Sequence, residues 1–261
     1  SHLCSDVPLS ILLSSGIDSK VIARYSLSSK VKAYTANFET NWREIEDSKK
    51  FANHFEGLEH KIINIKESKV FEVLEKIIEF IGEPFADASI IPLFYLYSNL
   101  PKNRKVVLQG DGGDELFGGY RRYQIFEMLM KFPKNNLLKN IPQINKINHR
   151  LNRLIFLSSF KDEELYKNIM TSDFIHFNTL SFFRNYFAKK QIDPLKNYGN
   201  SYIRDFRKTI RLETSEQLSC IDYINQLPNQ FLYKVDRVSM MCGIEARTPL
   251  IDIRLLKLIF S

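Results

Sequence analysis

Cysteine is scarce in this 261-residue sequence, and Cys4, Cys220 and Cys242 are widely separated and form no Cys-x-x-Cys pair. This usage argues against a disulfide framework or a zinc site, and it favours a reducing compartment such as the cytoplasm. No apolar run is long enough to span a bilayer, so no membrane contact is expected. No basic-then-apolar signal segment opens the chain, which runs almost directly into a strand-like run, and we expect an upstream domain to be missing.

Acidic residues are lacking in one long segment. The chain carries 37 Lys and Arg against 30 Asp and Glu, a net charge of +7. Residues 131–160 hold six of the basic residues and no acidic one. We favour a solvated helical surface or a seat for the missing domain, and RNA or a phosphate-rich substrate is the alternative.

Strand-like and helix-like runs alternate through the first third of the sequence. The expected strands are 8–13, 31–38, 60–65 and 105–110, and the expected helices are 17–27, 43–55, 67–81 and 91–100. This alternation predicts an α/β fold, a parallel sheet with flanking helices, whose ligands gather at the carboxyl ends of the strands. We expect three regions: an α/β core over 1–132, a helical region over 133–227, and a C-terminal segment over 228–261 that folds back on the site.

The polar stretch after the first strand, Ser-Ser-Gly-Ile-Asp-Ser at 14–19, is not a Walker A loop, because it lacks the Lys-Ser or Lys-Thr ending. Its hydroxyls and N–H groups sit at a strand-to-helix turn, where the positive end of the helix dipole favours an anion. The carboxylate of Asp18 fits such a site if Mg²⁺ is present, since Mg²⁺ binds one or two carboxylates together with phosphate oxygens. A helix capped by serine is the structural alternative.

Glycine is also scarce, yet five of the ten glycines fall within 110–119, a stretch that follows the fourth expected strand. Asp111, Asp114 and Glu115 are interleaved with them. Three crowded acids repel one another unless a cation or a basic ligand shares the site, and glycines at this density indicate close approach of backbone to a ligand. Together the two loops predict a cradle for a metal-bound polyphosphate.

Three ordered motifs resemble known families. Residues 12–19, LLSSGIDS, resemble the pyrophosphate loop SGGxDS of the N-type ATP pyrophosphatases. Residues 110–123, GDGGDELFGGYRRY, and 235–252, VDRVSMMCGIEARTPLID, resemble the synthetase domain of glutamine-hydrolysing asparagine synthetases, which β-lactam synthetases share. The resemblance implies the ATP-pyrophosphatase fold and a single synthetase domain without its N-terminal glutaminase domain. Cys4 does not replace the family's catalytic cysteine, because no domain surrounds it.

The resemblance also implies a reaction. ATP and a carboxylate, aspartate in the leading hypothesis, form an acyl-adenylate and pyrophosphate, and ammonia then displaces AMP to leave an amide. The implied cofactors are ATP and Mg²⁺, and ammonia would come from the missing glutaminase. The implied ATP- and pyrophosphate-binding residues are Leu12, Ser14, Ser15, Gly16, Asp18, Ser19, Gly110 and Gly112.

Roles for individual side chains follow from the same resemblance. Asp18 and Asp114 would hold the metal, and Asp111 would transfer a proton in the second step. Arg237 and Lys234, about one helical turn apart, would be catalytic residues that place positive charge against the phosphates, or form an ordinary surface pair. Glu83 and Asp87 would bind the acceptor substrate, or serve only as helix-end acids.

Two other functions remain open at this stage. The acceptor could be a different carboxylate, such as a sugar uronic acid in polysaccharide synthesis. A tRNA-modifying ATP pyrophosphatase, or a nucleic-acid module using the basic segment 131–161, is disfavoured by the GIEARTP stretch at 243–249 and by the absence of a cysteine pair near the loops. A homodimer is compatible with the sequence.

Overall fold

The computed structural model describes residues 2–38, 42–83, 85, 87–131, 154–155, 157–158, 160, 165–166, 169 and 214–259. The chain forms two compact units. We call residues 1–116 with 223–261 the sheet unit, and residues 117–222 the second unit. Most of the predicted helical region, and most of the basic segment 131–160, lies outside the described residues. The predicted boundaries at 132 and 227 stay predictions.

A five-stranded parallel sheet forms the centre of the sheet unit, with strand order β3-β2-β1-β4-β5. The strands are β1 (Leu9–Leu12), β2 (Lys32–Asn37), β3 (Glu59–Asn64), β4 (Val106–Leu108) and β5 (Glu245–Arg247). β4 (Val-Val-Leu) is buried on both faces and is wholly apolar, and β1 (Leu-Ser-Ile-Leu) is buried over its first three residues, with Ser10 as its one polar residue. The predicted α/β class with a parallel sheet is confirmed.

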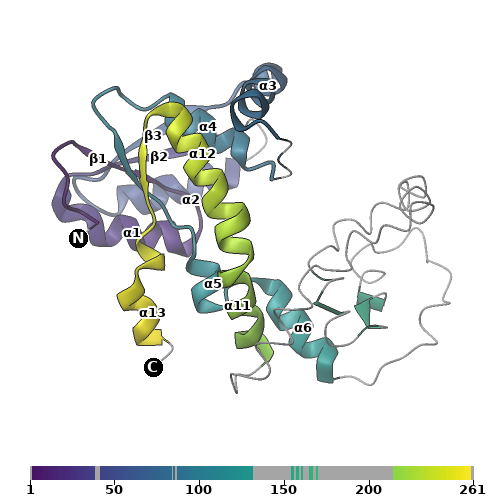
Figure 1. Cartoon of the computed structure of the whole chain (residues 1–261). Helices are drawn as coiled ribbons and strands as arrows, with labels where there is room; N and C mark the ends of the chain where they lie inside the picture. The colour runs from purple at the N-terminus through teal and green to yellow at the C-terminus, as the bar shows by residue number, and fades with distance from the viewer. Residues whose placement is uncertain are drawn as a thin grey trace. The chain divides into compact units, whose positions relative to one another are not determined.

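Helices cover both faces of this sheet (Figure 1). α1 (Ile17–Ser26) and α2 (Trp42–Asn53) pack on one face through a cluster that includes Ile11, Ile22 and Leu108. On the other face, α3 (Val70–Ile81), α4 (Ile90–Ser98) and α12 (Tyr233–Cys242) pack around Val107 and Val238. Short 3₁₀ turns at Leu27–Ser29, Glu67–Lys69 and Pro249–Ile251 connect these elements, and α13 (Ile253–Ile259) follows the last of them.

The carboxyl ends of β1 and β4 lie side by side, because these two strands pair directly in the sheet. The two unusual loops of the sequence follow these two ends, so the topology brings them together. Within the second loop the structure forms a short helix, α5 (Gly113–Phe117), which the sequence analysis treated as loop. Its Leu116 amide donates to the Gly112 carbonyl at 3.0 Å.

The described part of the second unit is helical. α6 (Arg121–Lys131) and the residues of α11 (Thr214–Ile224) up to Asp222 surround an apolar cluster that includes Tyr123, Phe126 and Leu218. A π-helical segment (Leu227–Leu232) then leads into α12 of the sheet unit. None of the described helices is both long and apolar enough to cross a membrane.

Candidate active site

The first loop is held by its own serines. The Ser14 amide donates to Ser19 Oγ at 3.0 Å, and the two hydroxyl oxygens lie 2.9 Å apart. The Gly16 amide donates to Ser14 Oγ at 3.1 Å, while Ser19 Oγ donates to the Gly16 carbonyl at 3.1 Å. These bonds pre-form the turn between β1 and α1 before any ligand binds.

The start of α1 is not capped by a serine. Its N-cap residue is Gly16, and no side chain bonds to the free amides of the first turn. The structural alternative of a serine-capped helix is therefore wrong. Because the first amides of a helix lack intrahelical acceptors, this end of α1 can accept an anion.

Asp18 packs directly against the glycine-rich loop after β4. A Cβ atom built on Gly113 would lie 2.4 Å from Asp18 Cγ, and one on Gly110 would lie 3.1 Å from Asp18 Cβ and 3.0 Å from the Ser19 amide nitrogen. Position 113 therefore requires glycine if Asp18 is to occupy this place, and a side chain at position 110 would press on Asp18 and on the backbone of Ser19. Gly112 adds a φ of +91°, and a Cβ there would meet Ile251 Cγ2 at 2.2 Å.

Three acids of the two loops act on one another. Burial raises the pKa of Asp18 above its ordinary value, and the charges of Asp114 and Asp111 raise it further. Burial likewise raises the pKa of Asp111, against the opposing effect of the Lys234 ammonium. The sequence-predicted acids are thus close enough to repel, and a cation between them would relieve that repulsion.

The donor set fits Mg²⁺ bound together with a polyphosphate. In the described part of the chain, no three His, Cys, Asp or Glu side chains are arranged as a ready metal cage. Mg²⁺ is commonly bound through one or two carboxylates, with phosphate oxygens and water completing the octahedron. Asp18 and Asp114, whose charges interact across the glycine cradle, are the two carboxylates suited to hold it.

Lys234 is buried and paired on the α4 side of the sheet. Its Nζ donates to Asp87 Oδ2 at 2.9 Å and to Ser89 Oγ at 2.6 Å. Its charge also acts on Asp111, as the pKa of that carboxyl indicates. The structure therefore brings together the predicted residues Lys234, Asp87 and Asp111.

A second hydrogen bond joins α12 to the segment between α3 and α4, which contains Glu83 and Asp87. The Tyr233 hydroxyl donates to Glu83 Oε1 at 2.8 Å, and the guanidinium of Arg237 lies 5.0 Å from the centre of the Tyr233 ring. The buried Nε atom of Arg237 has no hydrogen-bond partner among the described residues. Within the part of the chain that the structure describes, no hydrogen bond or ion pair joins Arg237 to the loop at 14–19.

Two buried residues near Asp111 were missed by the sequence analysis. The Tyr97 hydroxyl donates to Gln109 Oε1 at 2.6 Å, and burial followed by the charge of Asp111 raises the pKa of Tyr97 well above its ordinary value. The Gln109 side chain is buried and its Nε2 has no partner within the described residues. Gln109 could have been identified from sequence, because it is a polar residue that directly follows a buried strand and precedes Gly110.

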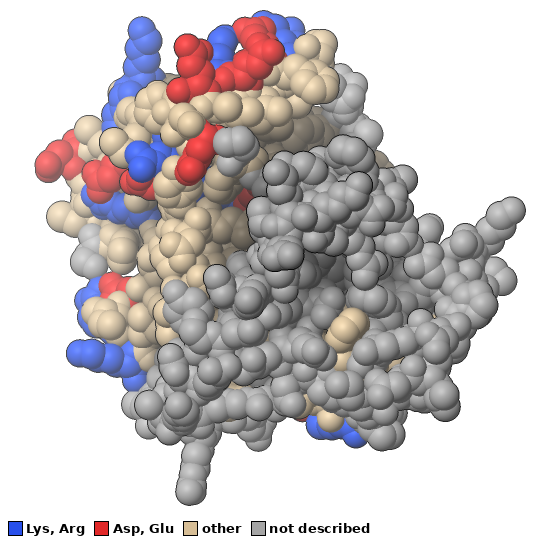
Figure 2. All heavy atoms as spheres, turned by 45° about the vertical axis from the view of Figure 1, so that its right-hand side comes forward, with Lys and Arg blue, Asp and Glu red and all other residues tan. Residues whose placement is uncertain are grey.

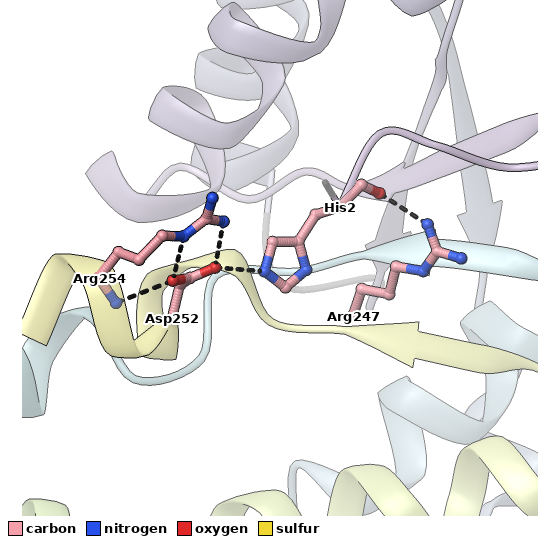
Figure 3. Close-up of polar contacts among 4 residues, drawn as sticks. All are labelled: His2, Arg247, Asp252 and Arg254. Atoms are coloured by element: carbon pink, nitrogen blue, oxygen red, sulfur yellow. Dashed lines mark hydrogen bonds and ion pairs between the residues drawn. The ribbon is translucent and has the colours of Figure 1, made fainter.

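Residues of the third motif, 235–252, bind His2 near the N-terminus. His2 Nε2 lies 3.2 Å from Asp252 Oδ2, Arg254 Nη2 donates to the same oxygen at 2.7 Å, and Arg247 Nη1 donates to the His2 carbonyl at 2.8 Å (Figure 3). The bonds from Arg254 hold the pKa of Asp252 well below its usual range. With Ile251 against Gly112, this segment also reaches the glycine-rich loop.

Charges of both signs are interspersed over the described part of the face in Figure 2. The basic segment that raised the alternative of a nucleic-acid partner lies mostly outside the described residues, so that alternative gains no support from the described surface.

Comparison with known proteins gives the family. The profile of the family described as asparagine synthase matches residues 1–261. The chain is 28% identical over 265 residues to asparagine synthetase [glutamine-hydrolyzing] 1 of Bacillus subtilis (strain 168), covering 96% of this chain and 40% of that protein. It is 26% identical over 261 residues to a putative asparagine synthetase [glutamine-hydrolyzing] of Mycobacterium bovis, covering 96% and 38%.

A third relative comes from an archaeon. Putative asparagine synthetase [glutamine-hydrolyzing] 2 of Methanocaldococcus jannaschii is 28% identical over 255 residues, covering 91% of this chain and 46% of that protein. The chain thus spans less than half the length of these curated relatives. With a profile match over its whole length and the two loops of the site at adjoining strand ends, the chain belongs to the asparagine synthase family.

Proposed function

We propose that this protein is an ATP-dependent, amide-forming ligase that converts aspartate to asparagine through a β-aspartyl-adenylate and releases AMP and pyrophosphate. The observation that carries the proposal is the packing of Asp18 against Gly110 and Gly113, which places its carboxylate beside Asp111 and Asp114. Three acids at the ends of two paired parallel strands suit Mg²⁺-bound ATP. The family match supports the same chemistry.

In the first step, an oxygen of the aspartate side-chain carboxylate attacks the α-phosphorus of ATP. Pyrophosphate leaves into the loop from Ser14 to Ser19, with Leu12, Gly110 and Gly112 lining the nucleotide. Mg²⁺ held by Asp18 and Asp114 would neutralise charge on the phosphates. The uncapped amides at the start of α1 stabilise the departing anion, and Arg237, whose Nε has no partner in the described chain, binds phosphate oxygens.

In the second step, ammonia attacks the carbonyl carbon of the adenylate. Asp111 accepts a proton from the attacking nitrogen, and burial favours this role because it raises the pKa of this carboxyl above its ordinary value and so strengthens its affinity for a proton. The carbon–oxygen bond to the phosphate then breaks, and its electron pair goes to AMP. Lys234 stabilises charge on that phosphate. Glu83 and Asp87 belong to the loop that borders the acceptor.

Ammonia would be supplied by a glutaminase part of the whole protein. The relatives are named glutamine-hydrolysing, and this chain spans 38–46% of the three described above. We place glutamine hydrolysis outside residues 1–261. A cytoplasmic location and a homodimer stay predictions.

A panel of carboxylates tests the acceptor. Isotope exchange between pyrophosphate and ATP is measured with aspartate, glutamate, glucuronate and no acceptor present. Of the three carboxylates, only aspartate should support exchange at a rate clearly above that of the reaction without acceptor. Exchange with glucuronate and not with aspartate would show that the acceptor is a sugar acid. If no carboxylate supported exchange under conditions in which ATP binds, the proposed ligase reaction would be wrong.

A further inference from the structure

The ammonium group of Lys234 is buried, and a buried charge requires hydrogen-bond partners. Its side chain is 9% exposed, and that of Asp87 is 14% exposed. An ammonium group has three hydrogens, and here one is donated to Asp87 and one to Ser89. In the described part of the chain the third hydrogen donates to no oxygen or nitrogen, and the Phe231 ring, with its centre 5.4 Å from Nζ, is a further contact of this ammonium. A ligand oxygen would be a stronger acceptor for this hydrogen than the ring.

Asp87 has its oxygens already engaged. Oδ2 accepts from Lys234, and Oδ1 accepts from both the amide and the hydroxyl of Ser89, at 2.9 and 2.6 Å. Ser89 in turn precedes α4 and accepts from Lys234 with the same hydroxyl. The three side chains form a closed ring of bonds. Asp87 thus already accepts three of the roughly four hydrogen bonds that a carboxylate can accept, and its charge is paired with Lys234, so its main partners are Lys234 and Ser89 and not an acceptor substrate.

We propose that Asp87 and Ser89 are positioning residues, which hold the ammonium of Lys234 beside Asp111 and leave one of its hydrogens for a phosphate oxygen of the adenylate. This role rests on the proposed function. When ammonia attacks, a nitrogen–carbon bond forms and Asp111 takes a proton. The carbon–oxygen bond breaks, and its electron pair moves to the AMP oxygen, where the third hydrogen of Lys234 stabilises the charge.

The chain offers a matched control for this role. Tyr233, the neighbour of Lys234 on α12, donates to Glu83 of the same loop. Tyr233→Phe removes one bond between α12 and the loop without touching the Lys234 pair. If Asp87 only fastened the loop to the helix, Tyr233→Phe and Asp87→Asn would have similar effects.

A double-mutant cycle in the full-length protein measures the coupling. Asp87→Asn should lower kcat for amide formation by about 10- to 100-fold, the usual effect of losing a partner that orients a site's ligand, with the acceptor KM nearly unchanged. Adding Asp87→Asn to Lys234→Met should cause no further loss, Asp87→Glu should recover part of the rate, and Tyr233→Phe should stay within about twofold of wild type. A raised acceptor KM at unchanged kcat, or losses that multiply in the double variant, would overturn the positioning role.

A second measurement needs no turnover, so it separates this proposal from the proposed function. Ligand-free protein is treated with an amine-acetylating reagent, and the acetylation rate of each lysine is followed by mass spectrometry. Lys234 should react at least about tenfold more slowly than Lys50, whose side chain is 69% exposed. Its protection should fall several-fold in Asp87→Asn and persist in Tyr233→Phe. Unchanged protection in Asp87→Asn would refute the positioning role even if the ligase reaction were established.

Discussion

At the scale of single residues, Asp18 and Asp111 hold carboxylates where their surroundings oppose charge. Burial raises both pKa values, and for Asp18 the neighbouring acids add to the effect. In the ligand-free protein these carboxylates therefore repel one another, and a bound cation would relieve this repulsion. At neutral pH the repulsion lowers the free energy of unfolding. Charges kept in such places at a cost to folding are typical of functional sites.

Asp111→Asn should separate the two chemical steps. The first step needs no base, because the acceptor carboxylate is already ionised at neutral pH. The second step loses its proton acceptor, so we expect amide formation to fall by about 10²–10⁴-fold while aspartate-dependent ATP–pyrophosphate exchange persists. In wild type, amide formation should also decline as the pH falls through the raised pKa of Asp111, since only the carboxylate accepts a proton. Equal losses in both assays would make Asp111 a phosphate or metal residue.

Gly113→Ala tests the cradle without removing any charge. The new methyl group would lie 2.4–2.6 Å from the carboxylate of Asp18, which must then move. We expect binding of Mg²⁺·ATP, measured by calorimetry, to weaken about as much as in Asp18→Asn. Circular dichroism should show that the variant is folded, and wild-type affinity in a folded variant would contradict the assigned position of Asp18.

At the scale of elements, β1 and β4 present the two loops, and α12 carries residues that support the site. A π-helical segment precedes α12, and wide turns of this kind are frequent near functional sites. In the second unit, α6 and α11 are joined by a buried ion pair. Asp222 is fully buried and accepts hydrogen bonds from Arg122, Tyr123 and Tyr166.

Asp222→Ala should destabilise the second unit. The substitution removes the buried acceptor of the Arg122 guanidinium and of two tyrosine hydroxyls, and breaking a buried ion pair from one side costs about 3–5 kcal/mol. Urea unfolding followed by circular dichroism measures the change. Glu127→Gln is the matched control, because it weakens only an exposed bond to Lys131 and keeps an acceptor for Ser215. A loss below about 1 kcal/mol would show that the cluster contributes little.

Several elements could be predicted from sequence because local patterns determine them. The first four strands follow from apolar runs bounded by turns, and the helices between them from their periodicity. β5 was missed because its three residues, Glu-Ala-Arg, carry two charges and lie at the sheet edge, where one flank needs no partner. α5 was missed because glycine and acids hide a helix of only five residues.

At the scale of the whole molecule, contacts between residues far apart in the sequence are the part of the site that could not be predicted. The α/β pattern alone places Asp18 and Asp111 after the carboxyl ends of strands, whereas the pairing of β1 with β4, which makes those ends adjoin, comes from the structure. The bond between Lys234 and Asp87 joins residues 147 positions apart and depends on how α12 packs against α4, which no local pattern encodes. The buried pair of Tyr97 and Gln109 joins α4 to the end of β4, and it too depends on how a helix packs on the sheet.

Residues 1–261 alone should use ammonium and not glutamine as nitrogen donor. Glutamine hydrolysis requires an activated nucleophile, usually a thiolate. Burial raises the pKa of Cys242 to about 11 and also raises that of Cys220, so neither is a thiolate at neutral pH. Amide formation with each donor, and glutamate release from glutamine, are measured side by side. Glutamate produced by this chain would contradict the expectation.

The path of one oxygen atom tests the central claim most directly. Full-length protein is supplied with ATP, Mg²⁺, ammonium and aspartate whose side-chain carboxylate carries ¹⁸O, and the products are weighed by mass spectrometry. Attack of the carboxylate on the α-phosphorus, followed by cleavage of the carbon–oxygen bond, predicts AMP that contains one ¹⁸O for each asparagine formed, with unlabelled pyrophosphate. Label in inorganic phosphate together with ADP, or asparagine formed with unlabelled AMP, would contradict an acyl-adenylate held at this site.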